Sequence, residues 1–213
     1  MNVSADRRRT KSKTKARRRE PVTLTVPRDL GLRASPGAFC KLCRINPDLR
    51  LERAADGEVI VMAPAGTESG WRNGKLTMRL GNWAEKDGTG EFFDCSTGFT
   101  LPDGRIVSPD GSWVTRERWL ALPPKSRLRF AQLSPDFVVE ISSRSDDLGV
   151  ARKEMLDYLG QGVRLGWLLD PRSGLVEIYR PGRPFEALAR PVTLSGEDVL
   201  PGFVLDLKGI LFD

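Results

Sequence analysis

The segment 134–142, Ser-Pro-Asp-Phe-Val-Val-Glu-Ile-Ser, restricts the fold of this chain more than any other feature of its sequence. Its aromatic and β-branched residues predict a strand, and a strand this apolar is typical of a central position covered on both faces. Alternation places Phe137, Val139 and Ile141 on one face and Asp136, Val138 and Glu140 on the other. An unpaired carboxylate there is strongly unfavourable, so we expect Glu140 to be paired, protonated or bound to a metal.

The segments before this strand are divided by clusters of Gly, Pro and Asp, which is typical of short elements joined by tight turns. The Asp56-Gly57 turn predicts an N-terminal β-hairpin of strands 49–53 and 58–62. Thr67 is expected to cap a helix that runs to Lys86, where Gly88 and Gly90 end it.

Three strands are expected next, over 91–101, over 105–115 with an interruption near Pro109, and over 136–142. A turn at 102–104 makes the first two a second hairpin. A helix is expected over 147–161, ended by Gly162, with an apolar side formed by Leu148, Ala151, Met155, Leu156 and Leu159. Strands 163–170 and 175–180 follow. This order predicts an α/β fold with a central mixed sheet flanked by helices, and not a sandwich or a bundle.

The chain has 213 residues, enough for one domain with a sizeable core, and none of them is histidine. Without an imidazole, Ser-His-Asp and Cys-His hydrolases are excluded, so hydrolysis would have to use carboxylates, lysines, hydroxyls or a metal.

Cys40 and Cys43 form a CxxC pair, but Cys95 is the one further thiol and cannot complete a tetrahedral zinc site. Buried thiols in a reducing cytosol are the favoured interpretation.

Positive charge is concentrated at the N-terminus. Residues 1–20 contain nine Lys and Arg against two Asp and Glu, so the remaining residues carry a net charge of −1 out of the total of +6. We expect residues 1–20 to be a disordered basic tail, either a non-specific tether to nucleic acid or a solubilising extension, and residues 21–213 to form a single domain.

The longest apolar runs are far shorter than the roughly 20 residues of a membrane span, so a cytoplasmic protein is expected.

Two acids lie on neighbouring expected strands. Asp110 enters the strand that continues through Trp113, and Glu140 lies in strand 136–142. Carboxylates from adjacent strands can converge on a hard cation such as Mg²⁺, which activates water and stabilises a pentavalent phosphate. Glu68, in the first turn of the first helix, could add a third oxygen. The pattern alone leaves open that Asp110 caps a turn and that Glu140 pairs with an arginine.

The first helix also carries a charged stripe, in which Glu68, Arg72, Lys75 and Arg79 recur at helical spacing. The stripe could follow a phosphate backbone. The favoured interpretation is a solvated face with a Glu68–Arg72 ion pair.

A series of motifs runs through residues 40–213. It includes Asn46-Pro-Asp-Leu-Arg-Leu-Glu52-Arg, Asp56-Gly-Glu-Val, Ser108-Pro-Asp110, Pro135-Asp-Phe-Val-Val-Glu140, Gly162-Val-Arg-Leu-Gly-Trp167 and Gly196-Glu-Asp-Val-Leu-Pro-Gly-Phe203. Together these motifs resemble the Uma2 family of restriction-endonuclease-like proteins, which belongs to the PD-(D/E)XK nuclease superfamily.

The resemblance implies a restriction-endonuclease-like α/β core with a central mixed sheet, and a nuclease centre that uses Mg²⁺ or Mn²⁺. Carried over to this sequence, it makes Asp110 the first metal carboxylate, Glu140 the second and Glu68 the acid on the helix. Asp136 could join them, although a Pro-Asp opening of the strand explains that residue equally well.

The sequence departs from the superfamily pattern at the lysine. The pattern places a lysine two positions after the second acid, where this chain has Ser142. Relatives supply one from the next helix, directly before the methionine, and that position is Glu154 here, preceded by Lys153. One residue along a helix rotates a side chain by about 100°. Lys153 is therefore the candidate for positioning the attacking water, but its side chain points in the required direction only if the helix register shifts by one residue.

These observations predict a metal-dependent endonuclease that hydrolyses DNA phosphodiester bonds, with Asp110, Glu140, Glu68 and Lys153 as its catalytic residues. The alternative is a catalytically inactive nuclease-fold module that binds nucleic acid or a protein partner, which the displaced lysine favours. A homodimer is one arrangement in which such a nuclease could cut both strands. No nucleotide cofactor is expected, because the Gly-rich turns lack the sequence of a phosphate loop.

Overall fold

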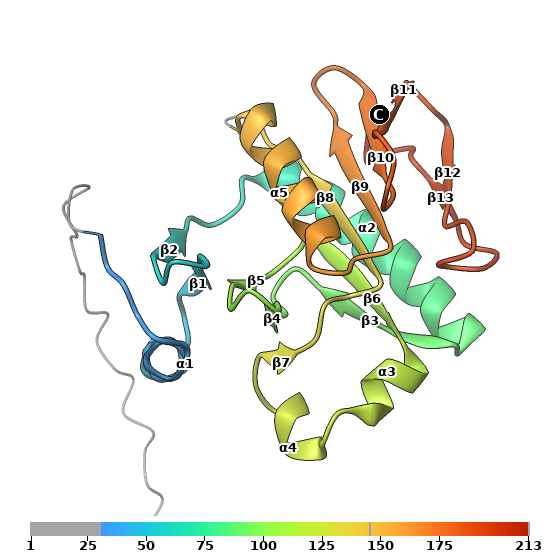
Figure 1. Cartoon of the computed structure of the whole chain (residues 1–213). Helices are drawn as coiled ribbons and strands as arrows, with labels where there is room; N and C mark the ends of the chain where they lie inside the picture. The colour runs from blue at the N-terminus through green and yellow to red at the C-terminus, as the bar shows by residue number, and fades with distance from the viewer. Residues whose placement is uncertain (1–30, 145, 213) are drawn as a thin grey trace, which may run out of the picture. The chain divides into compact units, whose positions relative to one another are not determined.

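The strand expected over 136–142 is β8 (Phe137–Ile141), which lies inside a six-stranded sheet (Figure 1). This computed structural model describes residues 31–144 and 146–212. The sheet has the spatial order β11 (Glu186–Ala189), β10 (Leu175–Tyr179), β9 (Leu165–Asp170), β8, β6 (Gly111–Thr115), β3 (Gly90–Asp94). The β8–β9 pair is parallel and the other pairs are antiparallel, so the predicted central mixed sheet is confirmed.

The two faces of β8 bury different side chains, as alternation predicts. Phe137 and Val139 lie in a core cluster with side chains of α2 (Thr67–Asp87). Val138 lies in a second cluster with side chains of α5 (Leu148–Gly160), the helix that connects β8 to β9. Figure 1 shows the two helices on opposite sides of the sheet. The apolar run therefore has no exposed face, because a helix covers each side of the sheet.

Helix α2 follows its local sequence closely. Leu76, Leu80 and Ala84 recur every four residues and are buried against the sheet. Gly88 ends the helix in the left-handed conformation, with a φ of 72°. The expectation that Thr67 caps the helix is wrong: Gly66 takes the extended conformation of an N-cap, and Thr67 is already the first helical residue.

A second, five-stranded sheet contains the predicted N-terminal hairpin. Its spatial order is β2 (Val59–Met62), β1 (Arg50–Arg53), β5 (Ile106–Val107), β4 (Phe99–Thr100), β7 (Ala131–Gln132). The hairpin β1–β2 is confirmed, and Gly57 in its turn has a φ of 94°. The expected strand 91–101 is wrong as one element, because β3 and β4 belong to different sheets. The Asp94 carboxylate accepts hydrogen bonds from the N–H and the hydroxyl of Ser96, which turns the chain between them.

Several elements lie outside the sequence predictions. They are α1 (Pro36–Ile45), α3 (Arg116–Ala121), α4 (Pro124–Arg127), the strands β7 and β11, and the hairpin of β12 (Thr193–Ser195) and β13 (Val204–Asp206). The apolar side expected for the last long helix is also partly wrong. Met155 and Tyr158 are its buried residues, whereas Leu156 is 58% exposed. The buried face of α5 is thus rotated relative to the predicted one, and this rotation matters for the candidate site.

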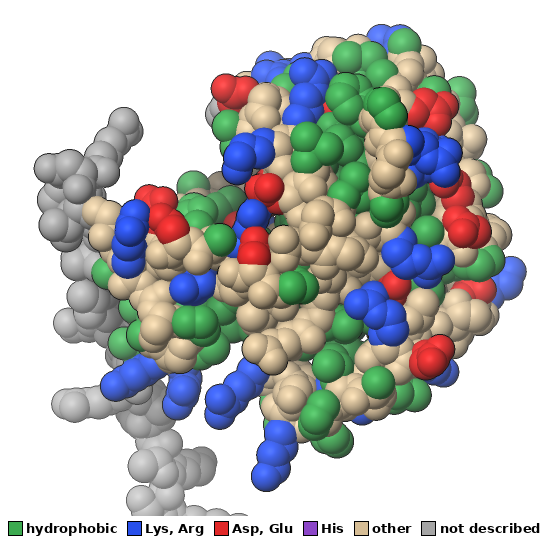
Figure 2. Space-filling view, viewed as in Figure 1, with side chains coloured by type: hydrophobic (Ala, Val, Ile, Leu, Met, Phe, Trp, Pro, Cys, Tyr) green, Lys and Arg blue, Asp and Glu red, His purple; other side chains and the backbone are tan. Residues whose placement is uncertain are grey.

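The predicted basic tail, residues 1–20, lies outside the described residues, so the division into a tail and a domain over 21–213 stays a prediction. In the part of the chain that the structure describes, no helix is long and apolar enough to cross a membrane. Figure 2 shows Lys and Arg side chains scattered among acidic and apolar ones on the visible face, without one large basic patch.

Gly90 offers a test of the packing at the edge of the larger sheet. A Cβ at this position would run into the indole ring of Trp113 and the carbonyl oxygen of Val114. We expect Gly90→Ala to lower the free energy of unfolding by about 2–3 kcal/mol. Gly74 is the matched control: a Cβ there meets no atom within 4 Å. Inside a helix, Gly74→Ala should raise the free energy of unfolding by about 0.5–1 kcal/mol. Urea unfolding measures both, and an undiminished stability of Gly90→Ala would contradict this packing.

Candidate metal centre

Asp110 and Glu140 lie opposite each other at the ends of two neighbouring strands. β6 pairs antiparallel with β8, with Gly111 opposite Val139, and the preceding residue, Asp110, therefore lies opposite Glu140. Gly111 permits this close approach, since a Cβ there would lie only 3.1 Å from Cγ1 of Val139 and 3.4 Å from Cδ2 of Leu76. The structure thus brings together the two acids that the sequence singles out.

Backbone and side-chain groups hold both carboxylates in place. The Asp110 N–H donates to Oε2 of Glu140 (3.3 Å), and the Ile141 N–H donates to Oδ2 of Asp110 (3.0 Å). From α2, the Asn73 amide donates to Oδ1 of Asp110 (2.8 Å). From α5, the Tyr158 hydroxyl lies 3.1 Å from Oε1 of Glu140. The helices on the two faces of the sheet therefore each orient one acid.

Two further acids adjoin this pair. Glu154 of α5 lies within reach of the same Tyr158 hydroxyl, at 3.2 Å. Glu52 of β1 accepts a hydrogen bond from the Ser108 N–H, at 3.0 Å. One hydroxyl has one proton to donate, so Tyr158 can serve only one of its two carboxylate neighbours at a time. These acids form what we call the acidic cluster: Glu52, Asp110, Glu140 and Glu154.

Burial is the main cause that raises the pKa of every carboxyl group in the acidic cluster. It raises the pKa of Glu140 well above the ordinary value, with the carboxylates of Glu154, Asp110 and Glu52 acting in the same direction. Burial and the Glu154 carboxylate raise the pKa of Glu52 to about 7. The pKa values of Asp110 and Glu154 are raised by burial as well. The cluster is therefore short of compensating positive charge.

Arg50 supplies some of that charge. It lowers the pKa of Glu52 and of Asp110 against the effect of burial, while its Nη2 donates to the Ser108 carbonyl oxygen (2.9 Å). Among the described residues, no lysine or arginine forms an ion pair with Asp110 or Glu140. The alternative in which Glu140 is neutralised by an arginine is thus not what the structure contains.

The donor set fits a hard divalent cation. Carboxylate oxygens are the ligands that Mg²⁺ and Mn²⁺ prefer, and Mg²⁺ is commonly held by one or two carboxylates with water in its other positions. Within residues 31–144 and 146–212, no three or more Asp, Glu or Cys side chains are arranged to hold one ion. An ion at this site would accordingly rest on two protein carboxylates, completed by water.

Asp136 does not join the acidic cluster. It accepts a hydrogen bond from the Thr115 N–H (2.9 Å), and its Oδ1 lies 2.8 Å from Nη1 of Arg118 and 3.7 Å from Nη1 of Arg164. Its side chain is 2% exposed. These contacts tie the start of β8 to the end of β6, so the explanation of Asp136 as a residue that opens the strand is the one observed.

Glu68 lies against two arginines. Its Oε1 is 2.8 Å from Nη2 of Arg72 and its Oε2 is 3.8 Å from Nε of Arg144, and these contacts lower the pKa of Glu68. The expected Glu68–Arg72 pair is confirmed, but Arg72 is buried, not on a solvated face, and its Nη1 donates to the Ile210 carbonyl oxygen. A role for Glu68 as third metal ligand stays a prediction, and it requires the carboxylate to leave both arginines.

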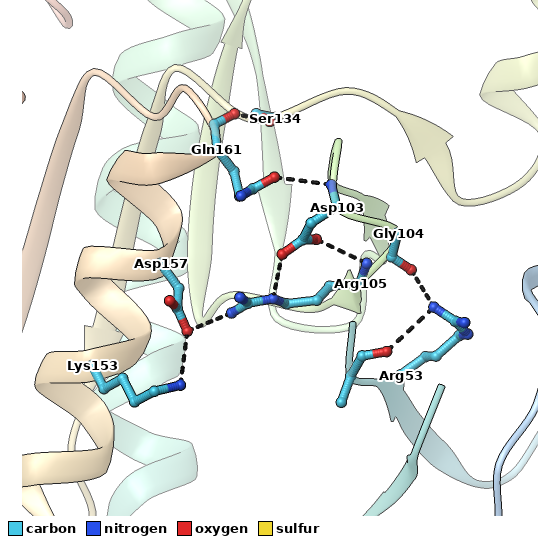
Figure 3. A network of polar contacts seen from close by, with 9 residues as sticks. Arg53, Asp103, Gly104, Arg105, Ser134, Lys153, Asp157 and Gln161 are labelled. Atoms are coloured by element: carbon cyan, nitrogen blue, oxygen red, sulfur yellow. Dashed lines mark hydrogen bonds and ion pairs between the residues drawn. The ribbon is translucent and has the colours of Figure 1, made fainter. Parts of the chain in front are cut away.

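Lys153 turns to Asp157 (Figure 3), and its Nζ lies 3.3 Å from Oδ2 of that residue. The Lys153 side chain is 77% exposed. Asp157 also binds Arg105 from the β4–β5 turn, at 2.6 Å. The neighbouring Glu154 is the residue that reaches the acidic cluster. The structure does not bring Lys153 to Asp110 and Glu140, so its role in positioning water also stays a prediction. Ser142, at the superfamily's lysine position, donates to Asp170 at 3.2 Å.

Sequence reasoning did not assign four residues that surround the two acids: Glu52, Asn73, Glu154 and Tyr158. Glu52 lies in a segment that resembles the family, and Glu154 occupies the position where the resemblance implies a lysine. Asn73 gave no signal, because a polar residue on a helix usually faces solvent. Its amide is oriented by Thr77, whose hydroxyl donates to Oδ1 of Asn73 at 3.2 Å.

Comparison with known proteins decides the family. The family model Uma2, described as "Putative restriction endonuclease", matches residues 36–208, which is most of the chain. The chain belongs to the Uma2 family. The resemblance found in the sequence motifs is therefore confirmed, and the family description places the protein among nucleases.

Solved structures support the fold of this Uma2 protein. It resembles the crystal structure of "a putative nuclease belonging to DUF820" from Anabaena variabilis ATCC 29413, with a TM-score of 0.68 and 20% identity, over 84% of this chain and 97% of that chain. A DrdV–DNA complex has a TM-score of 0.35 and 17% identity, over 56% of this chain and 10% of that chain. This similarity is too low to indicate a shared fold. No curated protein matches. The restriction-endonuclease-like α/β fold is confirmed.

The raised pKa of Glu52 predicts a pH dependence of stability. Between the ordinary pKa of 4.5 and the folded-state value of about 7, the folded protein binds more protons than the unfolded chain, so stability falls as the pH rises through this range. We expect Glu52→Gln to raise the free energy of unfolding by about 2 kcal/mol at pH 8 and by little at pH 5.

Urea unfolding at several pH values measures this effect. Glu58→Gln, which changes an exposed acid of the same hairpin, is the control and should retain the pH dependence of the unaltered protein. An equal gain at both pH values would show that Glu52 is not held protonated by its surroundings.

Proposed function

We propose that this protein is a Mg²⁺- or Mn²⁺-dependent endonuclease that hydrolyses DNA phosphodiester bonds at Asp110 and Glu140. The observation that carries the proposal is the arrangement of these two carboxylates. They face each other across the β6–β8 pair. The Glu140 carboxylate accepts from the Asp110 N–H, and the Asp110 carboxylate accepts from the Ile141 N–H. Among the described residues, no arginine forms an ion pair with either of them. Family membership and the shared fold support the same class of activity.

The proposed chemistry assigns a task to each residue around the ion. Asp110 and Glu140 hold it, and a divalent cation bound there would activate water and offset negative charge that develops on the phosphate. Asn73 and Tyr158 keep the two carboxylates in place through the hydrogen bonds described above. The raised pKa values favour the same proposal, since a bound dication makes ionisation of a crowded carboxylate cluster easier.

DNA is the proposed partner. The nine cations of residues 1–20 would provide sequence-independent affinity for phosphates, with a strong dependence on salt. The remaining residues carry a net charge of −1, so the domain itself does not act as a general polycation.

The rival proposal is a catalytically inactive nuclease-fold module that binds nucleic acid or a protein partner. One feature favours it: where the family resemblance implies a lysine, this chain has Glu154, whose carboxylate lies beside Tyr158 in the acidic cluster. A site without that ammonium lacks a cationic donor that orients water and stabilises developing charge.

Plasmid nicking in the presence of Mg²⁺ or Mn²⁺ tests the endonuclease. Because both carboxylates are needed to hold the ion, we expect Asp110→Asn and Glu140→Gln each to lower the nicking rate about a hundredfold or more. Glu85→Gln, which changes an exposed acid of α2, is the control and should cut at the unaltered rate. Nicking that persists in both site variants would assign the activity to another place or to a contaminant.

Calorimetric titration with Mn²⁺ separates the endonuclease from its rival. We expect saturable Mn²⁺ binding that Asp110→Asn and Glu140→Gln each abolish. Titration of Glu68→Gln tests whether Glu68 is a third ligand. An inactive module that has lost its metal site would show no saturable heat in the unaltered protein either.

A pair of variants on α5 tests the lysine. If Lys153 leaves Asp157 to position water, Lys153→Ala lowers the nicking rate about a hundredfold. Glu154→Lys restores an ammonium at the family's position and removes one carboxylate from the acidic cluster, so we expect it to raise the nicking rate about tenfold or more. An unchanged rate in Lys153→Ala would remove Lys153 from the proposed mechanism.

A further inference from the structure

A cavity of about 450 Å³ opens beside the acidic cluster, at the end of β8 that carries Glu140. Ile141 and Ser142, the two residues after Glu140, form part of its wall. Ile141 also donates its N–H to Oδ2 of Asp110 (3.0 Å), so one residue contacts the proposed metal ligand and lines the cavity. The cavity and the acidic cluster are therefore neighbours along the same strand end.

The wall of this cavity is rich in cations. Arg72 comes from α2, Arg144 from the loop after β8, and Arg172 from the turn between β9 and β10. The Arg72 side chain is 10% exposed and is fixed by its bond to the Ile210 carbonyl oxygen, whereas the Arg144 side chain is 83% exposed. Arg172 donates to the Arg144 carbonyl oxygen at 3.3 Å, which links the two loops. Arg172 also lies 3.3 Å from Oδ1 of Asp170 through its Nε, so the cavity combines two held guanidinium groups with the exposed one of Arg144.

The first turn of α2 adds to the positive potential. Glu68 and Ser69 of this turn line the cavity, and the N-cap Gly66 offers no side-chain hydrogen bond to the first N–H groups of the helix. The N-terminal end of a 21-residue helix favours negative charge.

Glu68 already places an oxyanion among these cations. Its two oxygens face different guanidinium groups, Arg72 at 2.8 Å and Arg144 at 3.8 Å. A phosphate has the same preference for guanidinium donors and could take over both contacts. The Glu68 carboxylate is about half exposed, so it can swing out of the cavity when another anion enters.

We propose that this cavity binds a backbone phosphate of the DNA strand, next to the phosphodiester that is cleaved, and that Glu68 is the internal anion it displaces. The inference rests on the proposed endonuclease function and extends it to substrate binding. It gives Glu68 a role different from that of a metal ligand: Glu68 competes with the substrate for Arg72 and Arg144.

Fluorescence anisotropy with a labelled DNA duplex in EDTA tests the site without cleavage. We expect the double variant Arg144→Ala/Arg172→Ala to bind the duplex about tenfold more weakly, with a salt slope smaller by about 1. Arg116→Ala is the matched control, since Arg116 is also an ion-paired arginine, 3.2 Å from Glu91, outside the cavity wall. Equal losses in the double variant and the control would overturn the proposal.

Glu68→Gln provides a gain-of-binding test that does not depend on removing an arginine. We expect it to tighten duplex binding about threefold or more, because the competing charge is gone, and to leave Mn²⁺ binding unchanged in calorimetry. Weaker Mn²⁺ binding with unchanged duplex affinity would make Glu68 a metal ligand and overturn its role here.

Inorganic phosphate is the second probe. We expect it to compete with the duplex in the unaltered protein and to compete less in the double variant. Tight phosphate binding through the arginines, with duplex affinity independent of them, would identify free phosphate as the ligand and overturn the assignment to DNA. Nicking assays separate this proposal from the endonuclease itself: normal nicking by the double variant would overturn only the phosphate site, whereas arginine-dependent binding without nicking would overturn only the endonuclease.

Discussion

The antiparallel pairing of β6 with β8 is the constraint on which the candidate site depends. It sets Asp110 opposite Glu140 and places the N–H of Asp110 and the N–H of Ile141 against the two carboxylates. Two carboxylates held this close repel each other and are partly removed from water, as their raised pKa values indicate. The buried clusters on the two faces of the sheet hold the strands together despite that repulsion. The core therefore stabilises an arrangement of charges that would separate in a less tightly packed sheet.

Some of this was predictable from the sequence, and the reason differs from element to element. The alternation along β8 was predictable because side chains in a strand repeat every two residues, and the break before Asp110 because Pro109 has no N–H to donate. The orientation of α5 was not. Leu156 is apolar yet exposed, while Tyr158 buries its ring and keeps its hydroxyl near the acids. A hydrophobicity pattern assigns Leu inward and Glu outward, so it misplaced the face of the helix and missed Glu154. Glu52 was missed for the same reason, since a charged residue in a strand is ordinarily expected to face water.

The family resemblance implies a lysine where this chain has Glu154, and a carboxylate in that place changes the electrostatics of the site more than the loss of one group would. Exchanging an ammonium for a carboxylate makes the local charge more negative by two units, which equals the charge of one divalent cation. Burial and the Asp110 carboxylate both raise the pKa of Glu154, so the surrounding protein does not fully neutralise this change. A carboxylate in place of a cationic donor would therefore increase the attraction for a metal ion. In the proposed endonuclease, metal binding and catalytic rate need not move together, because Glu154 would affect them in opposite ways.

The end of β8 separates two opposite charge environments by a single residue. Glu140 points to the acidic cluster, while Ile141 and Ser142 border a cavity with three arginines in its wall. Side chains alternate along a strand, so Glu140 and Ile141 face opposite sides of the sheet. A DNA strand that crosses the strand end would present one phosphate to a cation held by carboxylates and a neighbouring phosphate to guanidinium groups. The first phosphate would be positioned by a bound metal ion, and the second by hydrogen bonds from arginine side chains. In this proposal Glu68 occupies Arg72 and Arg144 until a phosphate arrives, and displacing it is part of the free-energy cost of binding.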